Sequence, residues 1–335
     1  MIDEIYPRLF LEVIPEDIKK RCPDFQLLMK GKETEGEISP IFGKLINTIY
    51  KQNPNSDIGL QYGKYLWPQT LCDYTRVMMT SNDVGSVLNL TERTHPAHGA
   101  SYYPFMLNKD KVFSLALTFP YKSYVSPMQR RFCIESVFSF TANGIKSTTE
   151  LDFKPLFASF DFPEPRYVNE YRAMFGDNLR FNAPLNMIEF DDRYLLKRLS
   201  TRNPTLHQLY LKKSRLGHQE KPNETNNVNN SFEQTAIAYM IKHCPESFSC
   251  QNLAQHMNIS VRGLQQKLKQ QGVTFSDICN LTRRELTKIY LIQERQTIDW
   301  TTDKLGFESR SGFSRFFKKE FHSTPSDFLA SAYYS

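Results

Sequence analysis

Two short segments in the last third of the chain carry side chains suited to reading base edges in duplex DNA. In the first, Arg262, Gln265 and Gln266 lie around the apolar pair Leu264 and Leu268. Arginine matches the O6 and N7 atoms of guanine, and glutamine matches N6 and N7 of adenine. On a helix the two leucines face inward, so the polar side chains point outward. The pattern predicts base contacts, with a solvated helix surface as the alternative.

The second segment has the same arrangement around Phe313 and Phe317. Its outward candidates are Ser311, Ser314 and Arg315, of which Arg315 is the strongest because a serine hydroxyl discriminates bases only weakly. Lysines on both segments are predicted to contact phosphates, which position a protein on DNA without specifying sequence. These lysines are Lys267, Lys269, Lys318 and Lys319.

Each segment is preceded by a short helical stretch and a tight turn, and the two copies form an internal repeat. The turns hold Asn258 and Gly306, and Ser260 and Ser309 are placed to cap the longer helices after them. Short helix, turn, serine cap and longer helix together indicate a helix-turn-helix, present twice.

The segment Thr274–Gln296 between the copies is predicted to be one long helix. Thr274 with Asp277 three residues later resembles a capping box, and an apolar stripe continues as far as Ile292. About 23 helical residues span about 34 Å, close to the roughly 34 Å of one turn of B-DNA. A rigid helix of this length is expected to hold the two recognition helices over successive major grooves.

Residues 249–329 resemble the paired helix-turn-helix domain of the AraC/XylS transcription regulators. The most specific pieces are Leu305-Gly306-Phe307-Glu308-Ser309, Phe313-Ser314-Arg315-Phe316-Phe317-Lys318 and Thr324-Pro325-Ser326-Asp327-Phe328. Residues 161–199 are similar to the amino-terminal domain of the subgroup that includes ornithine- and arginine-responsive regulators and VirS. Gly59-Leu60-Gln61-Tyr62-Gly63 fits the same subgroup.

The resemblance implies a sequence-specific regulator of transcription, an expected partner of RNA polymerase, that activates in response to a small-molecule effector. The sequence also departs from the family pattern at four positions. Thr301 and Thr302 stand where the family has an aliphatic residue and an alanine, which predicts a less apolar second unit. His322 replaces a glycine, and histidine tolerates a left-handed backbone better than most residues. Leu329 stands where the family has an arginine.

A composition break divides the chain. Residues 223–230 contain five asparagines and almost nothing apolar, so residues 212–230 are predicted to be an exposed linker. They separate an α+β regulatory domain, residues 1–211, from an all-α DNA-binding domain, residues 231–335. In the first domain, Ile41 to Ile49 and Thr80 to Leu90 read as helices, and Phe113–Phe119 and Ile188–Phe190 as strands.

Composition and motifs favour a DNA-binding protein over an enzyme. The net charge of +6 permits nucleic-acid binding without requiring it. The sequence shows no Cys-x-x-Cys pair, no Gly-x-Ser-x-Gly elbow and no complete P-loop, so we expect no metal, cofactor or catalytic residue. The acidic start and the lack of a long apolar stretch predict a cytoplasmic protein without a membrane segment.

Two other functions remain open, and a third is excluded. The first domain could be a small-molecule enzyme fused to a DNA reader, or the whole chain could be an architectural DNA binder with little sequence preference. A repair protein with similar units would need clustered zinc cysteines, which the spacing of the six cysteines does not provide.

The effector site cannot be assigned from the sequence. Arg130 with Arg131, or Arg166 with Arg172, could bind a carboxylate effector, although salt bridges explain these arginines equally well. A homodimer formed through the first domain would double the DNA contacts.

Overall fold

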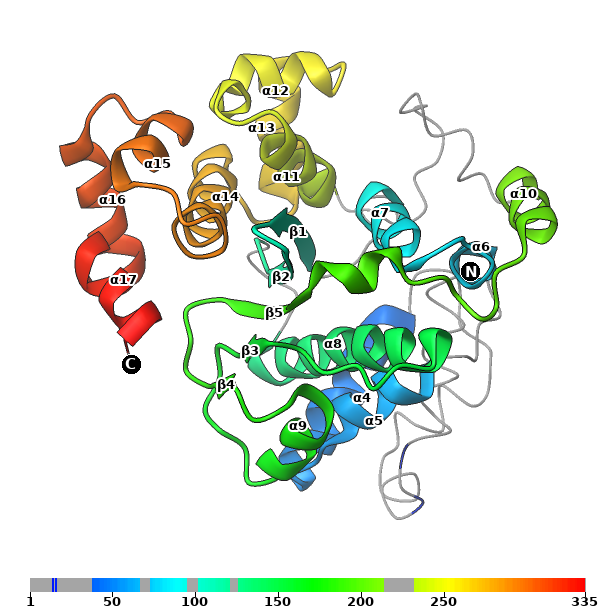
Figure 1. Ribbon diagram of the computed structural model, residues 1–335. Helices are drawn as coiled ribbons and strands as arrows, with labels where there is room; N and C mark the ends of the chain where they lie inside the picture. The colour runs from blue at the N-terminus through cyan, green and yellow to red at the C-terminus, as the bar shows by residue number, and fades with distance from the viewer. Residues whose placement is uncertain are drawn as a thin grey trace.

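The computed structural model describes residues 14, 16, 38–66, 73–94, 102–120, 126–213 and 232–334. Within these ranges an α+β domain is followed by a helical domain, which confirms the predicted fold class (Figure 1). Of the predicted linker, Lys212 and Lys213 form the end of a helix. The rest of the linker lies outside the described residues.

The described helices of the first domain are α4 (Ile38–Gln52), α5 (Ile58–Leu66), α6 (Asp73–Met79), α7 (Val84–Thr94), α8 (Pro127–Thr149), α9 (Val168–Phe175) and α10 (Pro204–Lys213). The helix predicted around Ile49 is α4, in which Leu45, Ile46 and Ile49 are buried. The helix predicted from Thr80 begins only at Val84, because the Asp83 side chain accepts the Ser86 N–H at 2.8 Å and so caps α7.

Helix α8 runs through the middle of this domain. Ser126 and Gln129 form a capping box at its start, with Pro127 in the first turn. Helix α5 packs tightly against it at two glycines: a Cβ atom at Gly63 would lie 2.2 Å from the Ser136 carbonyl oxygen. The glycine spacing of residues 59–63 therefore serves close contact between helices.

The first domain also contains a five-stranded sheet in the order β1-β2-β5-β3-β4. The strands are β1 (Tyr103–Lys109), β2 (Val112–Thr118), β3 (Phe157–Ser159), β4 (Leu179–Arg180) and β5 (Asn186–Asp191). Neighbours are antiparallel except β3 and β4, which are parallel. The two strands predicted from the sequence, β2 and β5, are confirmed.

The two faces of the sheet are buried against different parts of the chain. Leu115 and Ile188, paired across β2 and β5, belong to the same core cluster as Phe138 of α8. Ala116 and Met187 lie on the opposite face, called here the outer face, because side chains alternate along a strand. This outer face forms one apolar cluster, the shared core, with residues of the second domain such as Leu286, Ile289, Phe313 and Phe328.

The second domain is built from helices. They are α11 (Phe232–Lys242), α12 (Cys250–His256), α13 (Val261–Gln270), α14 (Phe275–Lys288), α15 (Ile298–Lys304), α16 (Arg310–Phe321) and α17 (Pro325–Tyr334), with a 3₁₀ turn at Glu246–Phe248. Figure 1 shows α14 between the α12–α13 pair and the α15–α16 pair.

The long connecting helix differs from the prediction of a single helix over Thr274–Gln296. The capping box of Thr274 and Asp277 is present and α14 begins at Phe275, but the α-helix ends at Lys288. One π turn, Ile289–Gln293, completes the segment. Together, the 19 residues of α14 and the π turn span about 28 Å at an α-helical rise, which is less than one turn of DNA.

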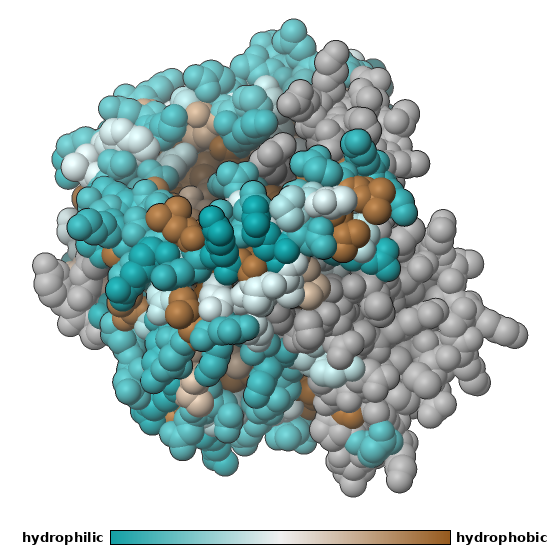
Figure 2. Space-filling model, turned by 45° about the vertical axis from the view of Figure 1, so that its right-hand side comes forward, coloured by the Kyte–Doolittle hydropathy of each residue, from teal (hydrophilic) through white to brown (hydrophobic). Residues whose placement is uncertain are grey.

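Large apolar side chains are exposed at few described positions. They are Leu156, Leu196, Leu206, Leu209 and Trp300. On the face of the molecule shown in Figure 2, the described surface is mostly hydrophilic and its apolar residues form small separate groups. Among the described helices, none combines the length and the apolar composition that a membrane span requires.

The shared core predicts that the two domains stay together without a covalent connection. A protease site placed between Lys213 and Phe232 should, after cleavage, yield fragments that elute as one complex in size-exclusion chromatography with light scattering. Full burial of each large apolar side chain contributes about 1.5–3 kcal/mol, and separation would expose several.

A matched variant sharpens this test. Ala116→Glu would place a carboxylate inside the shared core, so its cleaved fragments should separate. Elution of the cleaved parent protein as two independent fragments would contradict the prediction.

Candidate nucleic-acid interface

The first helix-turn-helix unit consists of α12, the four residues 257–260 and α13. Asn258 adopts a left-handed conformation with φ of 51°, and the following N–H of Ile259 donates to the Ala254 carbonyl at 3.0 Å. The Ser260 hydroxyl accepts the Gly263 N–H at 3.1 Å and caps α13. Leu264 and Leu268 are fully buried. The predicted turn, cap and inward face of the first unit are confirmed.

The second unit repeats these contacts with α15 and α16. Gly306 is left-handed with φ of 69°, and the Phe307 N–H donates to the Thr302 carbonyl at 3.1 Å. A Cβ atom at Gly306 would lie 3.1 Å from Cβ of Pro245, so this turn needs glycine for space as well as for conformation. The Ser309 hydroxyl accepts the Gly312 N–H at 3.2 Å.

The candidate base-contacting side chains differ in their exposure and in their local hydrogen bonds. Arg262, Gln265, Gln266 and Arg315 are exposed on the two recognition helices α13 and α16. Ser314 is half-buried. Ser311 is exposed, but its hydroxyl lies 3.0 Å from the hydroxyl of the capping residue Ser309. The geometry therefore favours the arginines and glutamines over the serines.

The four candidate phosphate-contacting lysines are all exposed: Lys267, Lys269, Lys318 and Lys319. Lys267 has a local partner, since its ammonium lies 5.2 Å from the centre of the Phe232 ring. A cation over an aromatic ring at an exposed site is worth only about 0.5–1 kcal/mol, so this contact leaves Lys267 available to a phosphate.

Arg283 of α14 joins the two units. Its guanidinium lies 4.4 Å from the Phe248 ring, which precedes the first unit, and 4.7 Å from the Phe307 ring in the turn of the second. It also donates to the Leu305 carbonyl at 3.1 Å. No local sequence signal marks this role, because the two rings are far from Arg283 along the chain.

The neighbouring charges of α14 are paired, and two of them, Glu285 and Lys288, are buried. The Glu285 carboxylate forms ion pairs with Arg284, at 3.0 Å, and with Lys288. Burial alone would raise the pKa of Glu285, but the charges of Lys288 and Arg284 lower it to about 2. Arg284 is therefore engaged in this charge network.

The departures from the family pattern have clear structural outcomes. His322 is left-handed with φ of 54° and ends α16, which confirms that the turn forms. Leu329 packs against the shared core. Thr301 and Thr302 are buried at the positions that Leu253 and Ala254 occupy in the first unit. Thr302 donates to the Ile298 carbonyl at 2.8 Å, whereas the Thr301 hydroxyl has no partner among the described residues.

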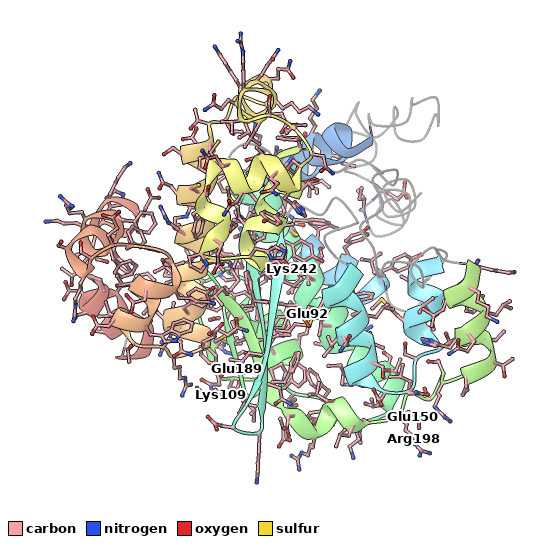
Figure 3. All side chains as sticks on the ribbon, turned by 90° about the horizontal axis from the view of Figure 1, so that it is seen from above. Glu92, Lys109, Glu150, Glu189, Arg198 and Lys242 are labelled. Atoms are coloured by element: carbon pink, nitrogen blue, oxygen red, sulfur yellow. The ribbon has the colours of Figure 1, made fainter. Side chains whose placement is uncertain are left out.

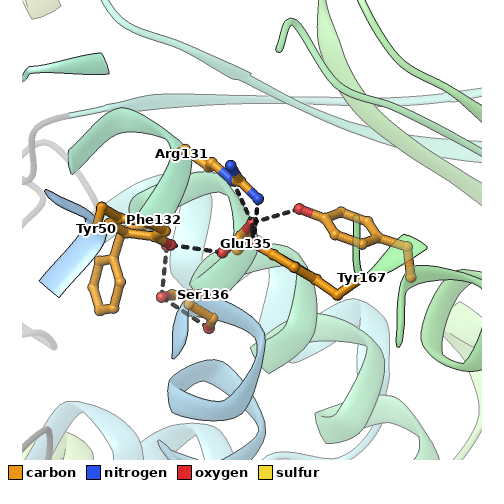
Figure 4. A network of polar contacts seen from close by, with 8 residues as sticks. Tyr50, Arg131, Phe132, Glu135, Ser136 and Tyr167 are labelled. Atoms are coloured by element: carbon orange, nitrogen blue, oxygen red, sulfur yellow. Dashed lines mark hydrogen bonds and ion pairs between the residues drawn. The ribbon is translucent and has the colours of Figure 1, made fainter. Parts of the chain in front are cut away.

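In the first domain a buried carboxylate gathers a polar network (Figure 4). Glu135 of α8 is fully buried and accepts hydrogen bonds from the hydroxyls of Tyr50, Tyr167 and Tyr171 and from Nε of Arg131. Burial and the charge of Glu135 raise the pKa of each of these tyrosines. Hydrogen bonds from residues of three helices, α4, α8 and α9, therefore converge on this one carboxylate.

The four arginines considered for a carboxylate effector are thereby distinguished. Arg131 is engaged by Glu135, and Arg130 forms an ion pair with Asp161. Arg166 is exposed, and Arg172 is exposed with a hydrogen bond to Asn169 at 3.2 Å. The sequence reasoning did not identify α8 or Glu135, although Ser126-Pro127-Met128-Gln129 is a recognisable helix start.

Comparison with known proteins matches both domains. Residues 40–199 match the family model of the arabinose-binding domain found at the amino terminus of AraC transcription regulators. Residues 253–331 match a helix-turn-helix domain model. These two ranges together cover most of the chain.

Among individual proteins, the chain is 24% identical over 170 residues to the ornithine utilization regulator of Pseudomonas aeruginosa. The match covers 50% of this chain and 48% of that regulator, so the chain spans about half the length of this curated relative. The crystal structure of the transcriptional regulator CdpR from Pseudomonas aeruginosa aligns with a TM-score of 0.44 at 15% identity, over 94% of this chain and 99% of that one.

The unpaired hydroxyl of Thr301 predicts a stabilising substitution. Thr301→Val keeps the shape and removes the buried hydroxyl, so the free energy of unfolding in urea should rise by about 1–3 kcal/mol. Thr302→Val is the matched control, since it loses the hydrogen bond to Ile298 and should bring no gain. Equal effects of the two substitutions would show that the missing partner is not the cause.

Proposed function

The chain belongs to the AraC family of transcription regulators, and we propose that it binds specific duplex DNA through both helix-turn-helix units under the control of a small-molecule effector. Residues 231–335 would bind DNA, and residues 1–211 would carry the effector-sensing role, joined by residues 212–230. The matched families are those of regulators rather than of enzymes.

One observation carries the proposal for DNA binding. Two helices with equivalent serine caps and equivalent buried faces present exposed long polar side chains at two corresponding positions, occupied by Gln266 and Arg315 and by Lys269 and Lys318. We assign base contacts to Arg262, Gln265, Gln266 and Arg315, with Ser311 and Ser314 as lesser contributors. We assign phosphate contacts to Lys267, Lys269, Lys318 and Lys319. The base contacts would select the sequence, and the phosphate contacts would fix the register on the duplex.

The effector is proposed to act by shifting a population of conformations of the two docked domains. The match of the first domain to an arabinose-binding domain, and a relative named for ornithine utilization, both support a small metabolite as ligand. We further propose that the protein activates transcription in the cytoplasm by contact with RNA polymerase. A homodimer would strengthen binding through effective concentration.

The proposal predicts two classes of alanine variant. Arg262→Ala and Arg315→Ala should each weaken binding to the protein's selected site by about 1–3 kcal/mol and leave binding to random duplex nearly unchanged. Lys318→Ala should weaken binding to both duplexes alike and flatten the salt dependence. Fluorescence anisotropy with the full chain, at several salt concentrations, measures both effects.

The result that would count against the base-contact assignment is an equal loss on both duplexes for Arg262→Ala and Arg315→Ala. Those arginines would then belong with the phosphate contacts. A parent protein that binds no duplex better than random sequence would remove the proposed function itself.

A further inference from the structure

The segment that joins the two helix-turn-helix units ends in a π turn. The Glu294 N–H donates to the Ile289 carbonyl at 2.9 Å, five residues back, and all residues of the turn Ile289–Gln293 are buried. Arg295 then adopts a left-handed φ of 54°, and α15 begins at Ile298. Single π turns are rare, and many lie at functional sites.

The first domain holds this turn by a set of hydrogen bonds from its β1–β2 hairpin. The buried Gln293 amide donates to the Phe105 carbonyl at 3.1 Å and to the carbonyl and hydroxyl of Ser114, at 3.3 and 3.0 Å. Lys109, near the tip of the hairpin (Figure 3), donates to the Glu294 carbonyl at 3.4 Å. One side chain of the connecting segment is thus bound to both strands of the hairpin.

Opposite charges also lie where the connecting segment meets the sheet. Glu189 of β5 is paired with Ser114 across the sheet and lies close enough to Arg295 for their charges to interact. Burial raises the pKa of Glu189, and the positive charge of Arg295 opposes that rise. On one side of Glu294, Gln293 is therefore hydrogen-bonded to the sheet, and on the other side the charge of Arg295 interacts with that of Glu189 in β5.

A π turn and an α turn send the next part of the chain in different directions. Each α-helical residue turns the chain by about 100°, so a change of one residue in the bonding pattern rotates the next segment by an angle of that order. Here the next segment is the second unit, α15 and α16. Its direction relative to the first unit is consequently sensitive to whether the π turn is kept.

We propose that Gln293 is a positioning residue through which the β1–β2 hairpin holds the π turn and so sets the base-pair spacing at which the two units read DNA. This inference rests on the proposed function. It assigns to the first domain a direct part in site selection, through a contact that touches neither recognition helix.

The test uses the full chain and the bipartite duplex that it selects from a random-sequence pool. Variants of that duplex carry one or two base pairs added or removed between the two recognised segments. Each added base pair rotates one segment by about a tenth of a turn. The parent protein should prefer its selected spacing by at least about tenfold over neighbours, and Gln293→Met should reduce the preference to less than about threefold.

Two further variants distinguish a positioning role of Gln293 from a general loss of DNA affinity. Gln271→Met removes a hydrogen bond within the second domain, in which the Gln271 amide oxygen accepts the Glu233 N–H at 2.9 Å, and it should keep the parent's spacing preference. Ser114→Ala removes one of the three acceptors of Gln293 and should give an intermediate preference. It also keeps the test decisive if Gln293→Met fails to fold.

The outcomes distinguish this inference from the function on which it rests. A parent protein with a clear spacing preference, matched by the Gln293→Met and Ser114→Ala variants, would overturn the inference alone. A uniform loss of affinity at every spacing would also overturn it, because it would show Gln293 to be structural only. A parent protein without any preferred duplex would overturn the proposed function and this inference together.

Discussion

The arrangement of the whole chain depends on the need to bury both faces of one small sheet. An antiparallel sheet can leave one face in water when its residues alternate between apolar and polar. Here the outer face carries Phe105, Ala116 and Met187, and the second domain covers it with α14 and the helices around it. The two domains therefore share apolar contacts across a continuous surface.

Local patterns predict the parts of this structure that local forces determine. The turn at Asn258, the caps at Ser260 and Ser309 and the strand around Leu115 depend on residues close together in sequence, and all of them could be predicted. The apolar spacing of the recognition helices likewise identifies their outward candidates, whose contacts with DNA remain a prediction.

The features that could not be predicted depend on distant partners. The end of α14 looks like ordinary helix in sequence, and its π turn is bound by a hairpin about 180 residues earlier, through Gln293 and Ser114. Ser114 and Ala116 alternate with larger apolar residues, which suggests a solvated face, yet both are buried. Arg283 similarly acquires its two aromatic partners only when the two units come together.

The Glu135 network has a consequence for how the first domain folds. Its hydrogen-bond donors Tyr50 and Tyr171 lie 85 and 36 residues away along the chain. A carboxylate buried without its partners is strongly destabilising, so an assembly that lacks α4 or α9 is poorly tolerated. The network thus makes the docking of these helices cooperative, and it discourages partly assembled intermediates in which α8 is covered from one side only.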